Sequence, residues 1–298
     1  MEHKNYYVSS RGIMKSCDFH STTPISSIRR IAFYPSIDTL KTINKPLIYV
    51  CSSALPHFRN LLPYIDYPFI LVSGDCDETI PNDIFTRSDF DTFLKNPYLL
   101  HWFSQNMIYK HPKITIMPIG LDYHTMVTRD IWGPTITSEN QELLLKSIKK
   151  LPFYERKIKT ICYANFHFQT KTKHGYDRLD AIKQINKDLI YYEPKMIPRL
   201  NTWNKQKDYV FVISPHGGGY DCHRLWEALI LGCIPIVKTS PIDQLYDDLP
   251  VLIVKEWSDI TEILLHETIE LFNKYQNQDQ KINDKLSLQY WINRMKNI

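Results

Sequence analysis

Glycine is scarce in this sequence, with 9 residues among 298, so a run of three glycines is informative. The sequence has no apolar run of about 20 residues, so we predict no membrane-spanning helix. Its first residues do not form the apolar core of a signal peptide. None of its 6 cysteines forms a CxxC pair, which argues against a zinc site. We therefore expect a soluble, reduced, cytoplasmic chain without a transmembrane anchor.

The sequence also lacks a run of lysine and arginine as dense as a nucleic-acid-binding patch. The formal net charge is only +4, which suits an anionic small ligand and predicts no nucleic-acid partner. An apolar share of 43% and a charged share of 23% are ordinary for a globular protein. A chain of 298 residues is long enough for two domains.

Short apolar runs alternate with helical patterns, which predicts an α/β fold of two Rossmann-like halves. Strands are predicted at residues 28–35, 46–53, 68–74, 113–120, 159–168, 188–193, 208–215, 233–238 and 249–255. Helices are predicted near residue 61 and at 88–94, 139–149, 178–186, 222–231, 260–275 and 286–295. The predicted domains span 1–135 and 136–280, and the helix in 281–298 is expected to pack back toward the first domain.

The densest chemistry lies in SPHGGGYDCHRLWEALILGCIPIV, which begins at Ser214. A predicted strand ends there, Gly217–Gly219 form a loop, and a helix follows. Asp221 is predicted to be the N-cap of that helix, and Gly232 to be the residue after its end, where a positive φ is needed. A strand, a glycine loop and a helix N-terminus together favour anion binding, because first-turn amides lack partners there.

Two charged residues on this helix complete a nucleotide-like pattern. Arg224, in the first turn, can contact a phosphate with its guanidinium, and Glu227 lies one turn further on the same side. A carboxylate there can accept hydrogen bonds from ribose hydroxyls. The alternative is that the two residues form a surface ion pair and that the glycines make only a tight turn.

This segment resembles the C-terminal signature of the exostosin-like glycosyltransferases. In that family a Ser/Pro- and Gly-rich loop precedes an Arg-x-x-Glu-Ala-Leu helix and a Gly-Cys-Ile-Pro strand. The similarity continues through LYDDLPVLIVKEWSDI, residues 245–260, and KITIMPIGLDYH, residues 113–124, resembles the segment joining the two domains of GT-B enzymes. The resemblance in sequence covers residues 114 to about 270. The first hundred residues resemble the family only in their predicted order of strands and helices.

The resemblance implies a GT-B fold, with an acceptor-side domain facing a sugar-nucleotide-binding domain across a cleft. It implies transfer of a sugar from a nucleotide-sugar donor, favouring a UDP-sugar such as UDP-xylose, UDP-galactose or UDP-glucuronate, to a glycan hydroxyl. No metal or other cofactor is expected. Retaining GT-B enzymes often carry an acid eight positions before the ribose-binding Glu; here that position is Gly219, which favours inversion. Eukaryotic members of this family are anchored in the Golgi membrane. Because no membrane anchor is predicted here, the chain is expected to be more similar to viral or bacterial relatives.

The residues of the predicted donor site are chosen by the family resemblance and by their position at the ends of predicted strands. By resemblance, Gly217, Gly218, Gly219 and Arg224 would meet the diphosphate and Glu227 the ribose. Residues bordering the loop or following predicted strands extend the donor set: Ser214, His216, His223, Asn165, His167 and Lys238. Arg178 and Arg199 are candidates for a second phosphate contact, although lone arginines are more often surface residues.

The acceptor side is predicted from residues 102–106. Gln105 and Asn106 are expected to reach sugar hydroxyls, and Trp102 to offer a stacking face; the alternative is an ordinary amphipathic segment. An inverting transfer needs a general base, for which Asp75 and Asp122 are the candidates because both follow predicted strands. For Asp75 the alternative, and the more common case, is a solvated carboxylate in an acidic loop; for Asp122 it is a cap on the linker.

Two rival functions remain open at this point. The tripeptide Asp75-Cys76-Asp77 resembles the metal-binding signature of GT-A transferases, which would make the enzyme metal-dependent. The other rival is a non-catalytic module that binds a sugar or a nucleotide without turnover.

Overall fold

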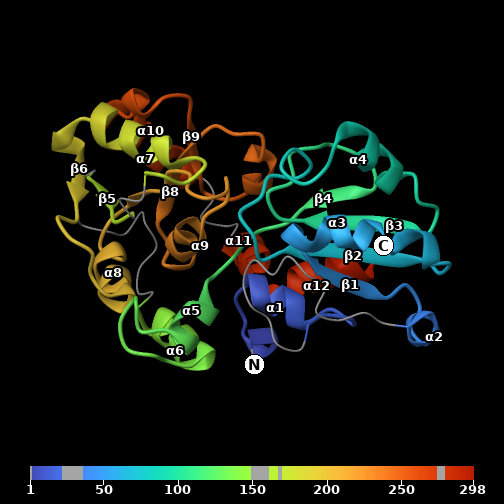
Figure 1. Ribbon diagram of the computed structural model, residues 1–298. Coiled ribbons are helices and arrows are strands. Elements are labelled where there is room, and N and C mark those ends of the chain that lie inside the picture. The colour runs from blue at the N-terminus through green and yellow to red at the C-terminus, as the bar shows by residue number, and fades with distance from the viewer. Residues whose placement is uncertain (1, 22–35, 149–160, 167–169, 274–278) are drawn as a thin grey trace.

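The computed structural model describes residues 2–21, 36–148, 161–166, 170–273 and 279–298, which form two sheets flanked by helices (Figure 1). One sheet has the strand order β1-β2-β3-β4, and the other has the order β6-β5-β7-β8-β9. Neighbouring strands pair in parallel throughout both sheets. The predicted α/β class is confirmed, and two parallel sheets are compatible with two Rossmann-like halves.

The strands are short and apolar, as expected for parallel strands covered on both faces. They are β1 (Leu47–Cys51), β2 (Phe69–Gly74), β3 (Leu99–Ser104), β4 (Ile114–Ile116), β5 (Cys162–Ala164), β6 (Ile190–Tyr192), β7 (Phe211–Ile213), β8 (Ile234–Lys238) and β9 (Leu252–Val254). The strand predicted at 28–35 lies outside the described residues. Strand β3 was not predicted, because His101 interrupts its apolar run.

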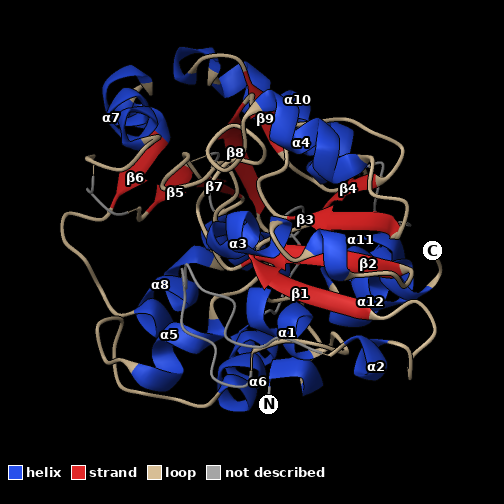
Figure 2. Ribbon diagram, turned by 45° about the vertical axis from the view of Figure 1, so that its right-hand side comes forward, coloured by secondary structure: helices blue, strands red, loops and turns tan. Residues whose placement is uncertain are grey.

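Helices connect and cover the strands in both views (Figures 1 and 2). They are α1 (Ser10–Lys15), α2 (Ile37–Leu40), α3 (Leu55–Arg59), α4 (Arg87–Leu94), α5 (Tyr123–Thr128), α6 (Ser138–Ile148), α7 (Gly175–Gln184), α8 (Arg199–Gln206), α9 (His223–Ile230), α10 (Glu262–Asn273), α11 (Asp279–Leu286) and α12 (Leu288–Lys296). None of these helices, which cover the described part of the chain, is long and apolar enough to cross a membrane.

Two buried apolar clusters hold the fold together. The first runs from the strands of the first sheet through Trp226 on α9 to Trp291 on α12. The second contains Phe211 of β7 and Leu265 of α10. Because the first cluster includes residues of both halves, the two sheets share one core on the side of α9.

The last helices return to the start of the chain. Helix α12 packs against α1, and the Leu288 amide donates to the Tyr6 carbonyl over 2.8 Å. The Val8 amide donates to the Leu286 carbonyl over 2.9 Å. Residues near both ends of the sequence therefore form one layer beside the first sheet.

Candidate functional site

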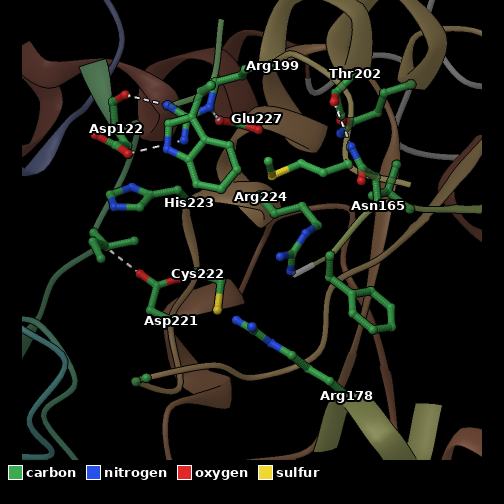
Figure 3. A pocket seen from close by; sticks show the side chains of 18 of the residues that line it. Asp122, Asn165, Arg178, Arg199, Thr202, Asp221, Cys222, His223, Arg224 and Glu227 are labelled. Atoms are coloured by element: carbon green, nitrogen blue, oxygen red, sulfur yellow. Dashed lines mark hydrogen bonds and ion pairs between the residues drawn. The ribbon is translucent and has the colours of Figure 1, made fainter. Parts of the chain in front are cut away.

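A cavity of about 420 Å³ is lined by residues from both halves of the chain (Figure 3). Asp77 and Asp122 come from the first half, and Arg178, Arg224 and Glu227 come from the second. Its volume lies in the range of small-molecule sites, roughly 300–1,000 Å³. The strand directions explain its position: Asp77 follows β2, and the glycine loop follows β7. Ligand crevices of open parallel sheets lie at such carboxyl ends.

Arg224, in the first turn of α9, is the least satisfied charge in the cavity wall. Its Nη1 is buried and has no hydrogen-bond partner among the described residues, although its guanidinium carbon lies 5.7 Å from the ring centre of Phe166. Burial lowers the pKa of Arg224, but a guanidinium stays protonated in a protein. A buried cation with an unused donor favours an anionic ligand.

Arg178, on α7, supplies a second guanidinium to the same cavity (Figure 3). Its Nε donates to the His216 carbonyl over 3.3 Å. A Cβ at Gly217 would collide with this guanidinium, so the absence of a side chain at Gly217 allows it to lie against the loop. Two guanidinium groups therefore lie in the cavity wall beside the N-terminal end of α9, which is itself the positive end of the helix dipole.

Arg199, the first residue of α8, bridges carboxylates of the two halves (Figure 3). Its Nη2 lies 3.2 Å from Asp122 Oδ2, and its Nε lies 3.6 Å from Glu227 Oε1. The guanidinium also lies 5.4 Å from the Trp132 ring centre. Arg199 is thus held in a network that fixes Glu227 against the cavity.

Asp122, a predicted general-base candidate, lines the cavity, but its carboxylate is engaged in this network. Its carboxylate caps α5 by accepting from the Thr125 amide over 3.0 Å. Burial acts to raise the pKa of Asp122, but His223 and Arg199 outweigh it, so the pKa is lowered well below its usual range. A carboxylate with so low a proton affinity is a poor base near neutral pH.

Asp75 and Asp77 lie two residues apart but face different surroundings. Asp75 has φ 57°, and its Oδ1 lies 3.9 Å from Arg11 Nε; burial raises the pKa of Asp75 to about 6. Asp75 is not among the cavity-lining residues, whereas Asp77 is. Burial is the main cause that raises the pKa of Asp77. The charge of His223 acts to lower this pKa and the charge of Glu78 acts to raise it, and the net shift is upward. The geometry therefore shifts the base candidate from Asp75 to Asp77.

Asp221 is not the N-cap of α9, which corrects the prediction. That position belongs to Cys222, which makes no side-chain capping bond. The Asp221 carboxylate instead accepts from the Ile119 amide over 2.7 Å and from the Trp226 indole over 2.9 Å. Burial raises the pKa of Asp221 to about 6. Because Ile119 belongs to the first half, Asp221 ties the glycine loop to that half. Gly232, with φ 76°, does follow the helix as predicted.

Replacing Asp221 with alanine is expected to destabilise the protein by about 2–5 kcal/mol, because two buried donors lose their acceptor. Urea unfolding at pH 7 measures the change in the free energy of unfolding. Asp208→Ala, at an exposed carboxylate in the turn after α8, is the matched control and should change stability by less than about 0.5 kcal/mol. Equal effects of the two substitutions would contradict the anchoring role of Asp221.

The remaining predicted donor residues divide into two groups. Gly218, Gly219, His223 and Asn165 line the cavity. Ser214, His216, Gly217 and Lys238 do not line it. His216 pairs with Asp177 through Nδ1 at 3.2 Å, and Lys238 pairs with Glu256 at 2.7 Å, so both have structural partners. Ser214 is a buried residue at the end of β7. His167 lies outside the described residues.

The three predicted acceptor-side residues are internal, which corrects that prediction. Trp102 in β3 is 0% exposed, and its indole donates to Ser73 Oγ over 2.8 Å, so it has no free face for stacking. Gln105 accepts from the Asp75 amide over 2.8 Å. Asn106 accepts from the Asp221 amide over 3.1 Å. These residues support the loops that border the cavity and do not reach into it.

Thr172 and Gln206 are two cavity residues that no sequence pattern indicated. Both line the cavity and carry buried polar atoms without a hydrogen-bond partner in the described part of the chain. Only the tertiary structure brings the end of α8 and the loop before α7 to one wall. Over the described ranges, no group of three or more His, Cys, Asp or Glu residues is arranged to hold a metal ion.

No protein-family model matches this chain, and no curated protein matches it either. A functional conclusion therefore depends on the chemistry of the cavity.

Proposed function

We propose that this chain is a nucleotide-sugar-dependent glycosyltransferase of the GT-B, exostosin-like type, with the donor bound in the cavity. The observation that supports it most is the buried Nη1 of Arg224 at the start of α9, which has no hydrogen-bond partner in the described residues, with Arg178 in the same cavity. Two guanidinium groups at a helix N-terminus suit a diphosphate, because each can donate two parallel hydrogen bonds to phosphate oxygens. The proposed donor is thus a nucleoside diphosphate sugar.

The proposed ribose contact is Glu227. It lies three residues after Arg224 on the same helix, lines the cavity and is held by Arg199. One turn of helix separates the two side chains, so a diphosphate at Arg224 places an attached ribose along α9 toward Glu227. Its carboxylate can accept hydrogen bonds from the two ribose hydroxyls.

The proposed general base is Asp77, which comes from the first half of the chain and lines the same cavity as the two arginines. Its carboxylate contacts Gly218, where a Cβ would collide with it. In the proposed reaction Asp77 takes the proton of the acceptor hydroxyl. The acceptor oxygen then forms a bond to the anomeric carbon while the bond from that carbon to the diphosphate oxygen breaks. Arg178 and Arg224 stabilise the negative charge that develops on the departing diphosphate.

The metal-dependent rival needs Asp75 and Asp77 at one ion. In the structure Asp75 pairs with Arg11 over 3.9 Å, and of the two carboxylates only that of Asp77 belongs to a residue that lines the cavity. The non-catalytic rival needs no base and is consistent with the same phosphate-binding wall. Turnover separates it from the proposed enzyme.

Release of free nucleotide from a panel of UDP- and GDP-sugars tests this proposal. We expect release from at least one donor by the wild-type protein, slow with water and faster with a glycan acceptor, and unchanged by EDTA. Nucleotide binding without release from any donor would favour the non-catalytic module. Activity that EDTA abolishes and Mn²⁺ restores would favour the metal-dependent rival.

A further inference from the structure

Gln206, the last residue of α8, has a buried polar side chain that lacks a hydrogen-bond partner within the part of the chain that the structure describes. The residue is 0% exposed, and neither Oε1 nor Nε2 has a hydrogen-bond partner among the described residues. More than about 90% of buried polar groups in proteins are hydrogen-bonded, and leaving a buried amide unpaired is unfavourable. Gln206 also lines the cavity, so a ligand that reaches this wall can supply the partner that its carboxamide lacks among the described residues.

The neighbouring polar groups on this wall are already occupied by the protein. Asn165 Nδ2 donates to Thr202 Oγ1 over 2.7 Å (Figure 3), and Thr202 Oγ1 donates to the Pro198 carbonyl over 3.3 Å. The Tyr163 hydroxyl donates to Glu193 over 3.2 Å. These contacts occupy three neighbouring polar groups, whereas the Gln206 carboxamide, like the Thr172 hydroxyl, has no hydrogen-bond partner among the described residues.

Helix α8 lines the cavity with one face. Arg199, Thr202 and Gln206 all line it, and their spacings of three and four residues place them on one side of the helix. Arg199 is at the end that contacts Glu227, and Gln206 is two turns further along. A ligand that meets Arg224 with phosphate and Glu227 with ribose would therefore extend its remaining part along α8 toward Gln206.

We propose that Gln206 recognises the nucleobase of the donor. The inference rests on the proposed function, since it assumes that a nucleotide occupies the cavity. A carboxamide presents an acceptor beside a donor, and the Watson–Crick edge of every nucleobase presents a donor beside an acceptor. The carboxamide pairs with that edge through two hydrogen bonds. Because it can rotate by 180°, it accepts either order of donor and acceptor, and pocket shape selects among the bases.

Calorimetric titration with UDP, CDP, GDP, ADP and inorganic pyrophosphate tests this role. Gln206→Met keeps the length of the side chain and removes its hydrogen bonds. We expect it to weaken the best nucleoside diphosphate roughly 10- to 100-fold, because the base then lacks its partner, and to leave pyrophosphate affinity unchanged. Asn204→Ala, at an exposed position of the same helix, is the control and should change neither affinity.

Each other outcome contradicts a specific part of the account. Unchanged nucleotide affinity in Gln206→Met would mean that the nucleobase does not contact Gln206. This result would overturn the inference and leave the proposed function intact. Equal losses for nucleotide and pyrophosphate would assign Gln206 a structural role and also overturn it. If the wild type binds none of the four nucleotides, the proposed function itself fails.

A measurement on the wild type keeps the inference testable if the Gln206 variant does not fold. The best-binding nucleotide is compared with its analogue methylated at a ring nitrogen of the Watson–Crick edge. We expect the methyl group to weaken binding at least tenfold, since it blocks one of the two hydrogen bonds. Equal affinity for the two compounds would overturn the inference.

Discussion

Asp77→Asn is expected to lower turnover by about 10²- to 10⁴-fold, the usual contribution of a general base, with donor affinity changed by less than threefold. The asparagine keeps the shape of the side chain beside Gly218 and removes the proton acceptor. Steady-state kinetics with the best donor and acceptor, combined with calorimetric titration of the donor, measure the two effects. Asp91→Asn on α4, at a carboxylate that pairs with Arg87 and does not line the cavity, is the control.

The same substitution should change the pH dependence of turnover. A base works only when it is ionised, so wild-type activity rises with pH through the pKa of Asp77. Because burial raises that pKa, the rise lies above the range of an ordinary aspartate, and activity is lost as the pH falls through it. Asp77→Asn should remove this limb. A variant with wild-type turnover and the same acidic limb would show that Asp77 is not the base.

Arg224→Ala is the second large expected effect, a loss of donor affinity of roughly 10- to 100-fold. A hydrogen bond to a charged group contributes about 1.5–3 kcal/mol, and Nη1 of Arg224 has no competing protein partner in the described residues. Titration with a nucleoside diphosphate and with pyrophosphate measures it, and both should weaken together. This common loss distinguishes Arg224 from Gln206, whose substitution should affect only the nucleotide.

Arg224→Lys is the matched variant. It keeps the charge but removes the planar fork, so it should recover only part of the lost affinity. Unchanged affinity in Arg224→Ala would place the phosphates elsewhere, and full recovery by lysine would show that charge alone matters at this position.

The local sequence predicted most of the second sheet and the two charged residues of α9. Parallel strands such as β7 and β8 are short apolar runs, which the sequence displays directly. Arg224 and Glu227 are three residues apart on a helix, so their common side follows from helical spacing. These features are local, and for that reason the sequence was sufficient.

The features that were missed depend on contacts between distant residues. Asp75 has a positive φ and pairs with Arg11, whereas Asp77 lines the cavity. No pattern within the tripeptide indicates which of the two carboxylates lines the cavity. Asp221 was assigned to the helix cap by its position, but the Ile119 amide and the Trp226 indole take its carboxylate. The unpaired state of Gln206 becomes visible only when every neighbouring side chain is in place.

Calorimetric titration of the wild-type protein with UDP, CDP, GDP and ADP in the presence of EDTA tests the central claim most directly. Our account predicts saturable binding of at least one nucleoside diphosphate with one site per chain, weakened at least tenfold by Arg224→Ala. Absence of binding for all four nucleotides, or binding that Arg224→Ala leaves unchanged, would contradict it.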